Sequence, residues 1–243
     1  MVKNDEQPAK PPAAVLQDTI VETLGREIIG GRDDAPGRFT LESLQERFGV
    51  SRTVVRDAVQ VLEALGLLVS KRRLGLLVQP PAEWNVFDPN VIRWRLESQG
   101  RDAQFRELTE LRIAIEPVAA SRAATRAGAE VGEELVRLAD ELGRLGRAGE
   151  IEAFLEADKA FHARILHASG NSMFSSLDAV VGEVLAGRTH GNLMPYVPSD
   201  VSLRLHEEVA AAIAAGSAGA AEERMRTLVD EVRRSLEARL ARR

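Results

Sequence analysis

The stretch that decides the fold lies between residues 48 and 58 and reads Phe48-Gly49-Val50-Ser51-Arg52-Thr53-Val54-Val55-Arg56-Asp57-Ala58. A short segment with helical spacing ends at the glycine, and a serine that can cap a helix precedes the next one. A glycine turn of this kind lets two helices cross steeply, so that the second can enter the major groove of DNA with its N-terminus first. The pattern therefore predicts a helix-turn-helix.

The flanking residues extend this motif on both sides. The spacing of apolar residues predicts helices over 15–30, 41–48 and 52–65, followed by short strands over 67–70 and 76–79. The two strands are joined by the cationic turn Lys71-Arg72-Arg73-Leu74-Gly75. Three helices followed by a small β-hairpin are the order of a winged helix-turn-helix, with the hairpin as its wing.

Cations gather on the expected DNA-binding elements. Between residues 47 and 73 there are six cations and two acids, although the whole chain has a net charge of -5. Two arginines four residues apart share one helix face, and a guanidinium suits the O6 and N7 edge of guanine. A solvated helix face is the alternative interpretation. The expected DNA-binding residues are Arg47, Ser51, Arg52, Thr53, Arg56, Lys71, Arg72, Arg73 and Gly75.

Beyond residue 80 the chain changes character. Both tryptophans, Trp84 and Trp94, lie in a segment broken by Pro89, and after Gly100 helical spacing continues to the end. Helices are expected over 103–127, 130–147, 150–169, 173–188, 199–215 and 218–241. The fold class is therefore mostly α, with a disordered lead over 1–13, a winged helix-turn-helix over 14–81, a linker over 82–102 and an all-helical antiparallel bundle over 103–243.

Composition excludes several classes of protein. The chain has no cysteine, which rules out a disulfide framework and thiolate metal sites. Its first ten residues are polar, and no run of about eighteen apolar residues is present. We therefore expect a cytoplasmic protein without a membrane partner.

Residues 15–80 resemble the DNA-binding domain of the GntR family, on the segment FGVSRTVVRDAVQVLEALGLL. The helical remainder resembles the FCD effector domain of the FadR-type branch of that family. The resemblance implies that Arg52 and Arg56 contact double-stranded operator DNA and that 71–75 is a minor-groove wing. One departure concerns the preceding helix, which begins Thr40-Leu41-Glu42-Ser43 and lacks an arginine that many members use on DNA. One such domain covers only a half-site, so we expect a homodimer on a pseudo-palindromic operator.

Three residues of the helical part have the spacing of a metal site. Asp158 and His162 are four apart on one helix face, and His206 belongs to another helix. A carboxylate and two imidazoles can hold zinc or another first-row divalent ion. The resemblance supports this, because many FCD domains bind a metal through such a pair and two later histidines, but Leu228 stands where the second would be expected. Either a three-ligand site remains, or His190 or the effector completes it, or the metal is lost and these residues bind the effector directly.

An arginine provides the expected anchor for a small organic acid. Arg112 matches an arginine that in the family faces the effector cavity, and a guanidinium in a bundle suits a carboxylate. An internal ion pair with Glu116, four residues on, is the alternative. The expected effector-binding residues are Arg112, Asp158, His162, His190 and His206.

The segment from Trp84 to Trp94 resembles regulators of the gluconate and galactonate type. This resemblance implies a repressor of a carbohydrate-acid catabolic operon that a sugar acid releases from DNA. The alternative from another class is a metal-dependent hydrolase or lyase that uses Asp158, His162 and His206. No second carboxylate lies at a motif spacing that would serve as its general base, so we expect a regulator and not an enzyme.

Overall fold

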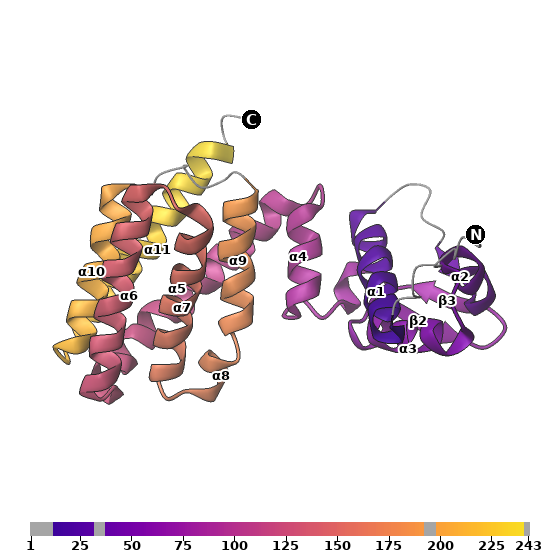
Figure 1. The fold of residues 1–243 in the computed structure, drawn as a ribbon, viewed down its shortest axis with the longest axis horizontal. Coiled ribbons are helices and arrows are strands. Elements are labelled where there is room, and N and C mark those ends of the chain that lie inside the picture. The colour runs from indigo at the N-terminus through magenta and orange to yellow at the C-terminus, as the bar shows by residue number, and fades with distance from the viewer. Residues whose placement is uncertain (1–11, 32–36, 192–197, 241–243) are drawn as a thin grey trace, which may run out of the picture. The chain divides into compact units, whose positions relative to one another are not determined.

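The computed structural model describes residues 12–31, 37–191 and 198–240. These divide into two compact units, residues 1–94 and 95–243 (Figure 1). Most of the expected disordered lead lies outside the described residues, and the first helix already begins at Ala13.

The first unit is a winged helix-turn-helix, as predicted. Its helices are α1 (Ala13–Gly30), α2 (Leu41–Phe48) and α3 (Arg52–Ala64). Its antiparallel sheet has the strand order β1-β3-β2, in which β1 is Arg38–Phe39, β2 is Leu68–Lys71 and β3 is Gly75–Val78. The sequence did not reveal β1, because a strand of two residues is too short to show any alternation.

Local chemistry explains the turn between α2 and α3. Thr40 and Ser43 form a reciprocal capping box at the start of α2, and the helix ends at Gly49, whose φ of 64° is left-handed. Helix α3 then buries Val55, Val59 and Leu62 in the core of the unit. This buried stripe directs the polar face of α3 outward, where it can meet DNA.

The segment over 82–102 has more structure than its description as a linker implies. It contains a 3-10 turn, η1 (Pro81–Glu83), and helix α4 (Pro89–Glu97). Trp94 is 1% exposed and packs in the core of the first unit against α1. A Cβ at Gly25 would lie 2.3 Å from its ring, so α1 needs a glycine at this point. Sequence reasoning missed α4 because its first residue, Pro89, and the aspartate before it look like a simple break.

The second unit is a bundle of helices, as predicted (Figure 1). Helix α5 packs on α7 and α11, α6 packs on α7 and α10, and α7 also packs on α9. The helix expected over 173–188 is in fact two helices, α8 and α9. The bounds are α5 (Arg101–Arg126), α6 (Ala129–Ala148), α7 (Ile151–Ala168), α8 (Ser172–Ser175), α9 (Asp178–His190), α10 (Asp200–Ala214) and α11 (Ala218–Leu240).

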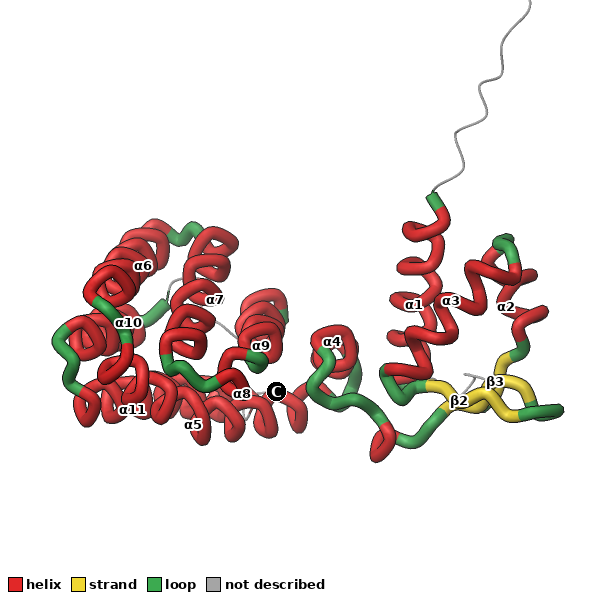
Figure 2. Tube along the Cα trace, turned by 90° about the horizontal axis from the view of Figure 1, so that it is seen from below, coloured by secondary structure: helices red, strands yellow, loops and turns green. Residues whose placement is uncertain are grey.

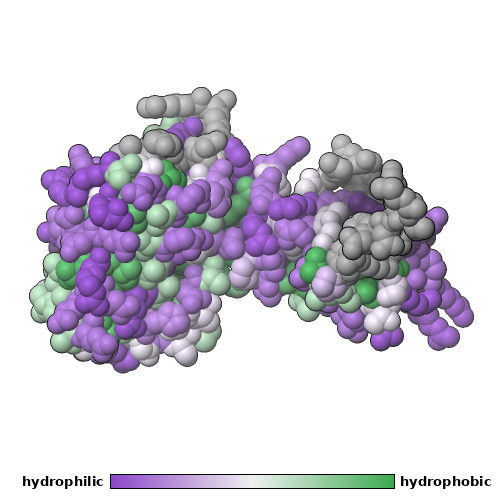
Figure 3. Space-filling view, in the orientation of Figure 1, coloured by the Kyte–Doolittle hydropathy of each residue, from purple (hydrophilic) through white to green (hydrophobic). Residues whose placement is uncertain are grey.

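Apolar side chains fill the bundle, and hydrophilic ones predominate on the face drawn in Figure 3. Across the described parts of the chain, none of the helices is both long and apolar enough to cross a membrane.

Candidate functional site

The exposed face of α3 carries the side chains expected to read DNA. Arg52, Thr53 and Arg56 are all exposed, while Val54 and Val55 between them are buried. Lys71, Arg72 and Arg73 are exposed at the turn of the hairpin β2–β3, which projects from the unit (Figure 2). The unit thus presents a cationic helix face and a cationic wing to the solvent.

Other members of the expected DNA-binding set have structural partners. Arg47 lies 2.8 Å from Glu27 and stacks over the ring of Phe48. The Ser51 hydroxyl accepts a hydrogen bond from the backbone of α3 and caps it. Gly75 has a φ of 85°, and a Cβ there would lie 2.6 Å from a backbone oxygen of β1. These residues shape the DNA-binding unit whether or not they also touch DNA.

One acidic residue belongs to this surface and was missing from the predicted set. Glu42, near the start of α2, lies 3.2 Å from Nη1 of Arg52, and both side chains are more than 60% exposed. The carboxylate therefore pairs with the arginine at the N-terminal end of α3, and the exposure of both side chains keeps the pair weak. The sequence contained a signal for this, because Glu42 belongs to the segment that departs from the family pattern.

The second unit brings four of the predicted effector residues together in its interior. Arg112 comes from α5, Asp158 and His162 from α7, and His206 from α10. All four are at most 3% exposed. Ionisable groups are rarely buried unless other polar groups compensate them. The four residues and Glu116, which is also buried, are called the polar cluster below.

The Asp158 carboxylate contacts the imidazoles of both His162 and His206. Its Oδ1 lies 3.3 Å from Nε2 of His162 and 3.2 Å from Nε2 of His206. Burial alone would raise the pKa of Asp158, but hydrogen bonds from the two imidazoles hold it well below its usual value. Asp158 is therefore an ionised carboxylate in the interior of the bundle.

The outer nitrogens of both histidines also face oxygen atoms. Nδ1 of His206 lies 2.7 Å from the backbone oxygen of Ser202, and Nδ1 of His162 lies 2.8 Å from Oε2 of Glu116. The contact of His206 is of the kind that orients metal-binding histidines in proteins, whereas Nδ1 of His162 lies close to Glu116 without a hydrogen bond to it. The potential ligand atoms of Asp158, His162 and His206 lie within 4.8 Å of one another. This donor set fits a divalent ion with three protein ligands and positions left for water or effector oxygens.

The position at which the family resemblance implies a further metal-binding histidine holds the apolar residue Leu228, which is buried among other apolar side chains. Leu228 is 1% exposed and belongs to the hydrophobic core of the bundle. His190, another option for completing the site, lies outside the cluster: its side chain is 59% exposed, and Nε2 lies 3.3 Å from Glu152. The position of His190 at the end of α9 explains this, because its ring faces the surface of α7.

Arg112 makes the internal ion pair that the sequence left as an alternative. Nε and Nη2 both donate to the Glu116 carboxylate, the second at 3.2 Å. Nη2 also lies 3.4 Å from Nε2 of His162. Burial alone would raise the pKa of Glu116, but the Arg112 guanidinium and His162 lower it to about 2. The pair is therefore fully ionised although each side chain is at most 2% exposed.

Two residues of this region were absent from the predicted site. Glu116 was considered only as a partner of Arg112, and it also contacts His162. Arg188 of α9 places Nη2 3.4 Å from Oδ2 of Asp158. The spacing of four residues on one helix indicates the Arg112–Glu116 pair, whereas nothing in the sequence indicates which residue of α9 approaches Asp158.

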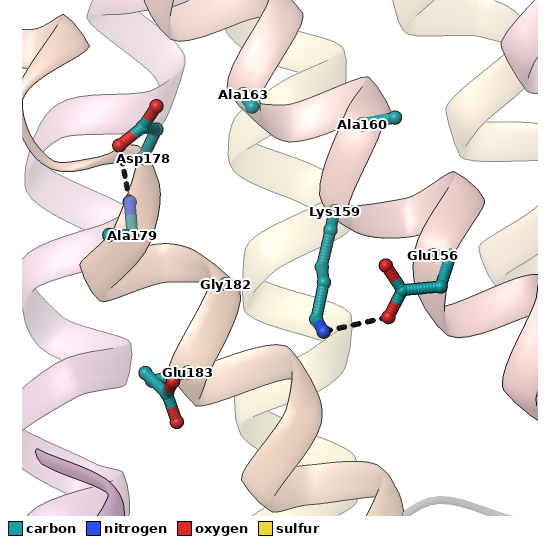
Figure 4. Close-up of a pocket in the computed structure, with 8 residues that line it drawn as sticks. All are labelled: Glu156, Lys159, Ala160, Ala163, Asp178, Ala179, Gly182 and Glu183. Carbon is teal, nitrogen blue, oxygen red and sulfur yellow. Dashed lines mark hydrogen bonds and ion pairs between the residues drawn. The ribbon is translucent and has the colours of Figure 1, made fainter. Parts of the chain in front are cut away.

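A separate hollow lies on the surface between α7 and α9 (Figure 4). Four small residues and four charged ones line it, and its cation, Lys159, lies 2.8 Å from Glu156. Lys159 is one residue after Asp158 and therefore points away from the face of α7 that carries the polar cluster. This groove does not contain the predicted effector residues.

Comparison with known proteins agrees with both halves of this description. The family model described as "Bacterial regulatory proteins, gntR family" matches residues 16–78, and the FCD domain model matches residues 107–231. The HTH-type transcriptional regulator YieP of Escherichia coli is 30% identical over 202 residues, which are 82% of this chain and 85% of that protein. The galactonate operon transcriptional repressor of the same organism is 30% identical over 169 residues, 69% of this chain and 72% of that protein.

A solved structure shows the same fold. McbR/YncC of E. coli superposes with a TM-score of 0.55 at 17% identity, covering 93% of this chain and 98% of that one. The matched relatives are transcriptional regulators, so the alternative of a hydrolase or lyase does not hold. A DNA-reading winged helix-turn-helix and an FCD domain, which binds small-molecule effectors, thus occur in one chain, which belongs to the gntR family of bacterial transcriptional regulators.

Proposed function

We propose that this regulator represses an operon for the catabolism of a sugar acid and is released from DNA by a small carboxylate such as galactonate or gluconate. The observation that carries the proposal is the polar cluster. A guanidinium, two carboxylates and two imidazoles are buried together in the FCD domain, where they suit the carboxylate and hydroxyl groups of such a ligand. The similarity to the galactonate operon repressor supports the same ligand class.

Within this proposal, the metal would be held by Asp158, His162 and His206. The ion would supply a positive charge and open coordination positions for oxygens of the acid. Because Leu228 provides no ligand, the site would have three protein ligands. The alternative is that the same residues bind the hydroxyl groups directly. Dialysed protein analysed for zinc, manganese and nickel, with the His206→Ala variant as comparison, distinguishes these two forms of the proposal.

We also propose how the chain is divided by function. Residues 14–81 bind the operator, residues 82–102 connect the two parts, and residues 103–243 bind the effector and form a homodimer. Two copies of the DNA-binding unit suit a pseudo-palindromic operator. Light scattering of the full chain, free and on DNA, tests this; a monomer in both states contradicts it.

The decisive experiment for the effector uses calorimetry and DNA binding together. An operator is first selected from random duplexes with the wild-type protein. Galactonate and gluconate are then titrated into the protein with and without divalent metal, and their effect on the affinity for the operator is measured. To release DNA the acid must bind one conformation more tightly than the other. If neither acid gives heat or changes operator affinity, the sugar-acid proposal is wrong.

A further inference from the structure

Glu116 already binds the Arg112 guanidinium, which the proposed function assigns to the carboxylate of the effector. Its two carboxylate oxygens accept hydrogen bonds from Nε and Nη2 of Arg112, which form one edge of the guanidinium. This is the arrangement in which an arginine usually binds a carboxylate ligand. Glu116 is 1% exposed, so water does not compete for this edge. The protein therefore holds a carboxylate of its own where the effector's carboxylate is expected.

The remaining edge of Arg112 is incomplete. Nη1 is buried and has no hydrogen-bond partner among the residues that the structure describes. A buried donor without an acceptor is unfavourable, because it has lost its hydrogen bonds to water. An acceptor group that lies beside Nη1 gains this bond.

Glu116 also has a second partner available. Its Oε2 lies 2.8 Å from Nδ1 of His162. Nδ1 is buried and has no hydrogen-bond partner among the residues that the structure describes, so a Glu116 carboxylate that leaves the Arg112 edge has a donor beside it and does not become an isolated buried charge. The exchange of one carboxylate for another on Arg112 is therefore chemically balanced, which would not be the case if Glu116 had Arg112 as its only partner.

We propose that Glu116 is an internal competitor of the effector, a carboxylate that a small carboxylic acid must displace in order to bind the Nε–Nη2 edge of Arg112. This inference rests on the proposed function for the identity of the acid but not for the exchange itself. Glu116 sets the concentration at which the acid binds, because part of the binding free energy is used to break the Arg112–Glu116 pair. Glu116 also restricts ligands to those with a carboxylate, since a neutral sugar cannot replace its negative charge beside the Arg112 guanidinium.

The first test removes the charge of the competitor and keeps its shape. Glu116→Gln retains an oxygen for Arg112 but binds it more weakly than a carboxylate does. Calorimetry of the full-length variant should show galactonate or gluconate binding at least about tenfold more tightly than to wild type, within the usual range of coupling between sites. Unchanged or weaker binding of an acid that does bind wild type would overturn the proposal and make Glu116 a ligand-holding or purely structural residue.

The second test does not require the sugar acid. Glu116→Ala leaves a space the size of a small carboxylate next to Arg112, and sodium acetate is the probe for it. Acetate should raise the melting temperature of this variant relative to sodium chloride at equal ionic strength. The matched control is Glu150→Ala, which removes an exposed partner of Arg144 and should show no difference between the two salts. No acetate effect beyond that of the control would overturn the exchange.

The two tests separate the failure of this inference from that of the proposed function. If neither sugar acid binds wild type but acetate stabilises Glu116→Ala, the exchange stands and the proposed effector is wrong. If Glu116→Ala does not fold, acetate is titrated into Glu116→Gln and wild type, and only the variant should bind it. Equal binding to both proteins would overturn the inference.

Discussion

The two functional regions of this chain place their charged groups in opposite surroundings. In the DNA-binding unit, Arg52 pairs with Glu42 at the surface, and both side chains are more than 60% exposed. In the bundle, Arg112 pairs with Glu116, and both are at most 2% exposed. An exposed pair contributes little to stability and leaves its cation free for a phosphate or a base. A buried pair is costly to break, so a ligand has to replace what it removes.

The largest expected effect is on the stability of the bundle. Arg112→Ala leaves the Glu116 charge buried and without its main partner, which should cost about 3–5 kcal/mol of unfolding free energy. Chemical denaturation followed by circular dichroism measures it. Arg144→Ala, which removes the exposed pair with Glu150, is the matched control and should cost at most about 1 kcal/mol.

A double variant separates the charge from the packing. Arg112→Met with Glu116→Leu removes both charges and keeps most of the volume, so it should recover much of the loss. If Arg112→Ala costs no more than the exposed control, the contrast between the two regions does not hold. The same measurement is needed for the Glu116 variants, because Glu116→Ala leaves the Arg112 charge buried without its main partner.

The Arg112–Glu116 pair should also make the free energy of unfolding depend on pH. Because the pKa of Glu116 is lowered from 4.5 to about 2, its contribution is complete above pH 4.5 and is lost as the pH falls toward 2. The contribution is on the order of 3 kcal/mol. Glu116→Gln should therefore lose less unfolding free energy than wild type between pH 5 and pH 3. Parallel losses in the two proteins would mean that other carboxylates dominate the acid response.

The two regions also differ in how far the sequence predicts them. The helix-turn-helix depends on neighbours in the chain, such as the Thr40–Ser43 cap and the turn at Gly49, so local pattern was enough. In the bundle, Arg112, Asp158, His162 and His206 were identified from spacing and family resemblance. Their mutual contacts are set by packing between α5, α7 and α10, which no local pattern reveals. The approach of Arg188 to Asp158 and the burial of Trp94 were missed for the same reason.

Loss of an exposed arginine on α3 should affect DNA binding more than folding. Arg52→Ala and Arg56→Ala should each remove an expected charge-assisted contact to DNA worth about 1–3 kcal/mol. Fluorescence anisotropy with the selected operator measures the loss, and the melting temperature should stay close to that of wild type. Arg52→Ala also leaves Glu42 without its cation, so Arg52→Ala with Glu42→Gln should recover part of the affinity. Operator affinity that is unchanged in both single variants, at matched salt, would mean that α3 does not read DNA.

The smallest effect is expected at the wing, and it has a distinct signature. Lys71, Arg72 and Arg73 are exposed on the hairpin turn, where each can neutralise one phosphate. Replacing one of them by alanine should lower the slope of log affinity against log salt by about 0.9, with a similar loss of affinity for all DNA sequences. Leu74 at the same turn is 54% exposed but uncharged, so Leu74→Ser should leave the slope unchanged and serves as the matched control. A sequence-dependent loss in the cation variants would instead indicate that the wing contacts base edges.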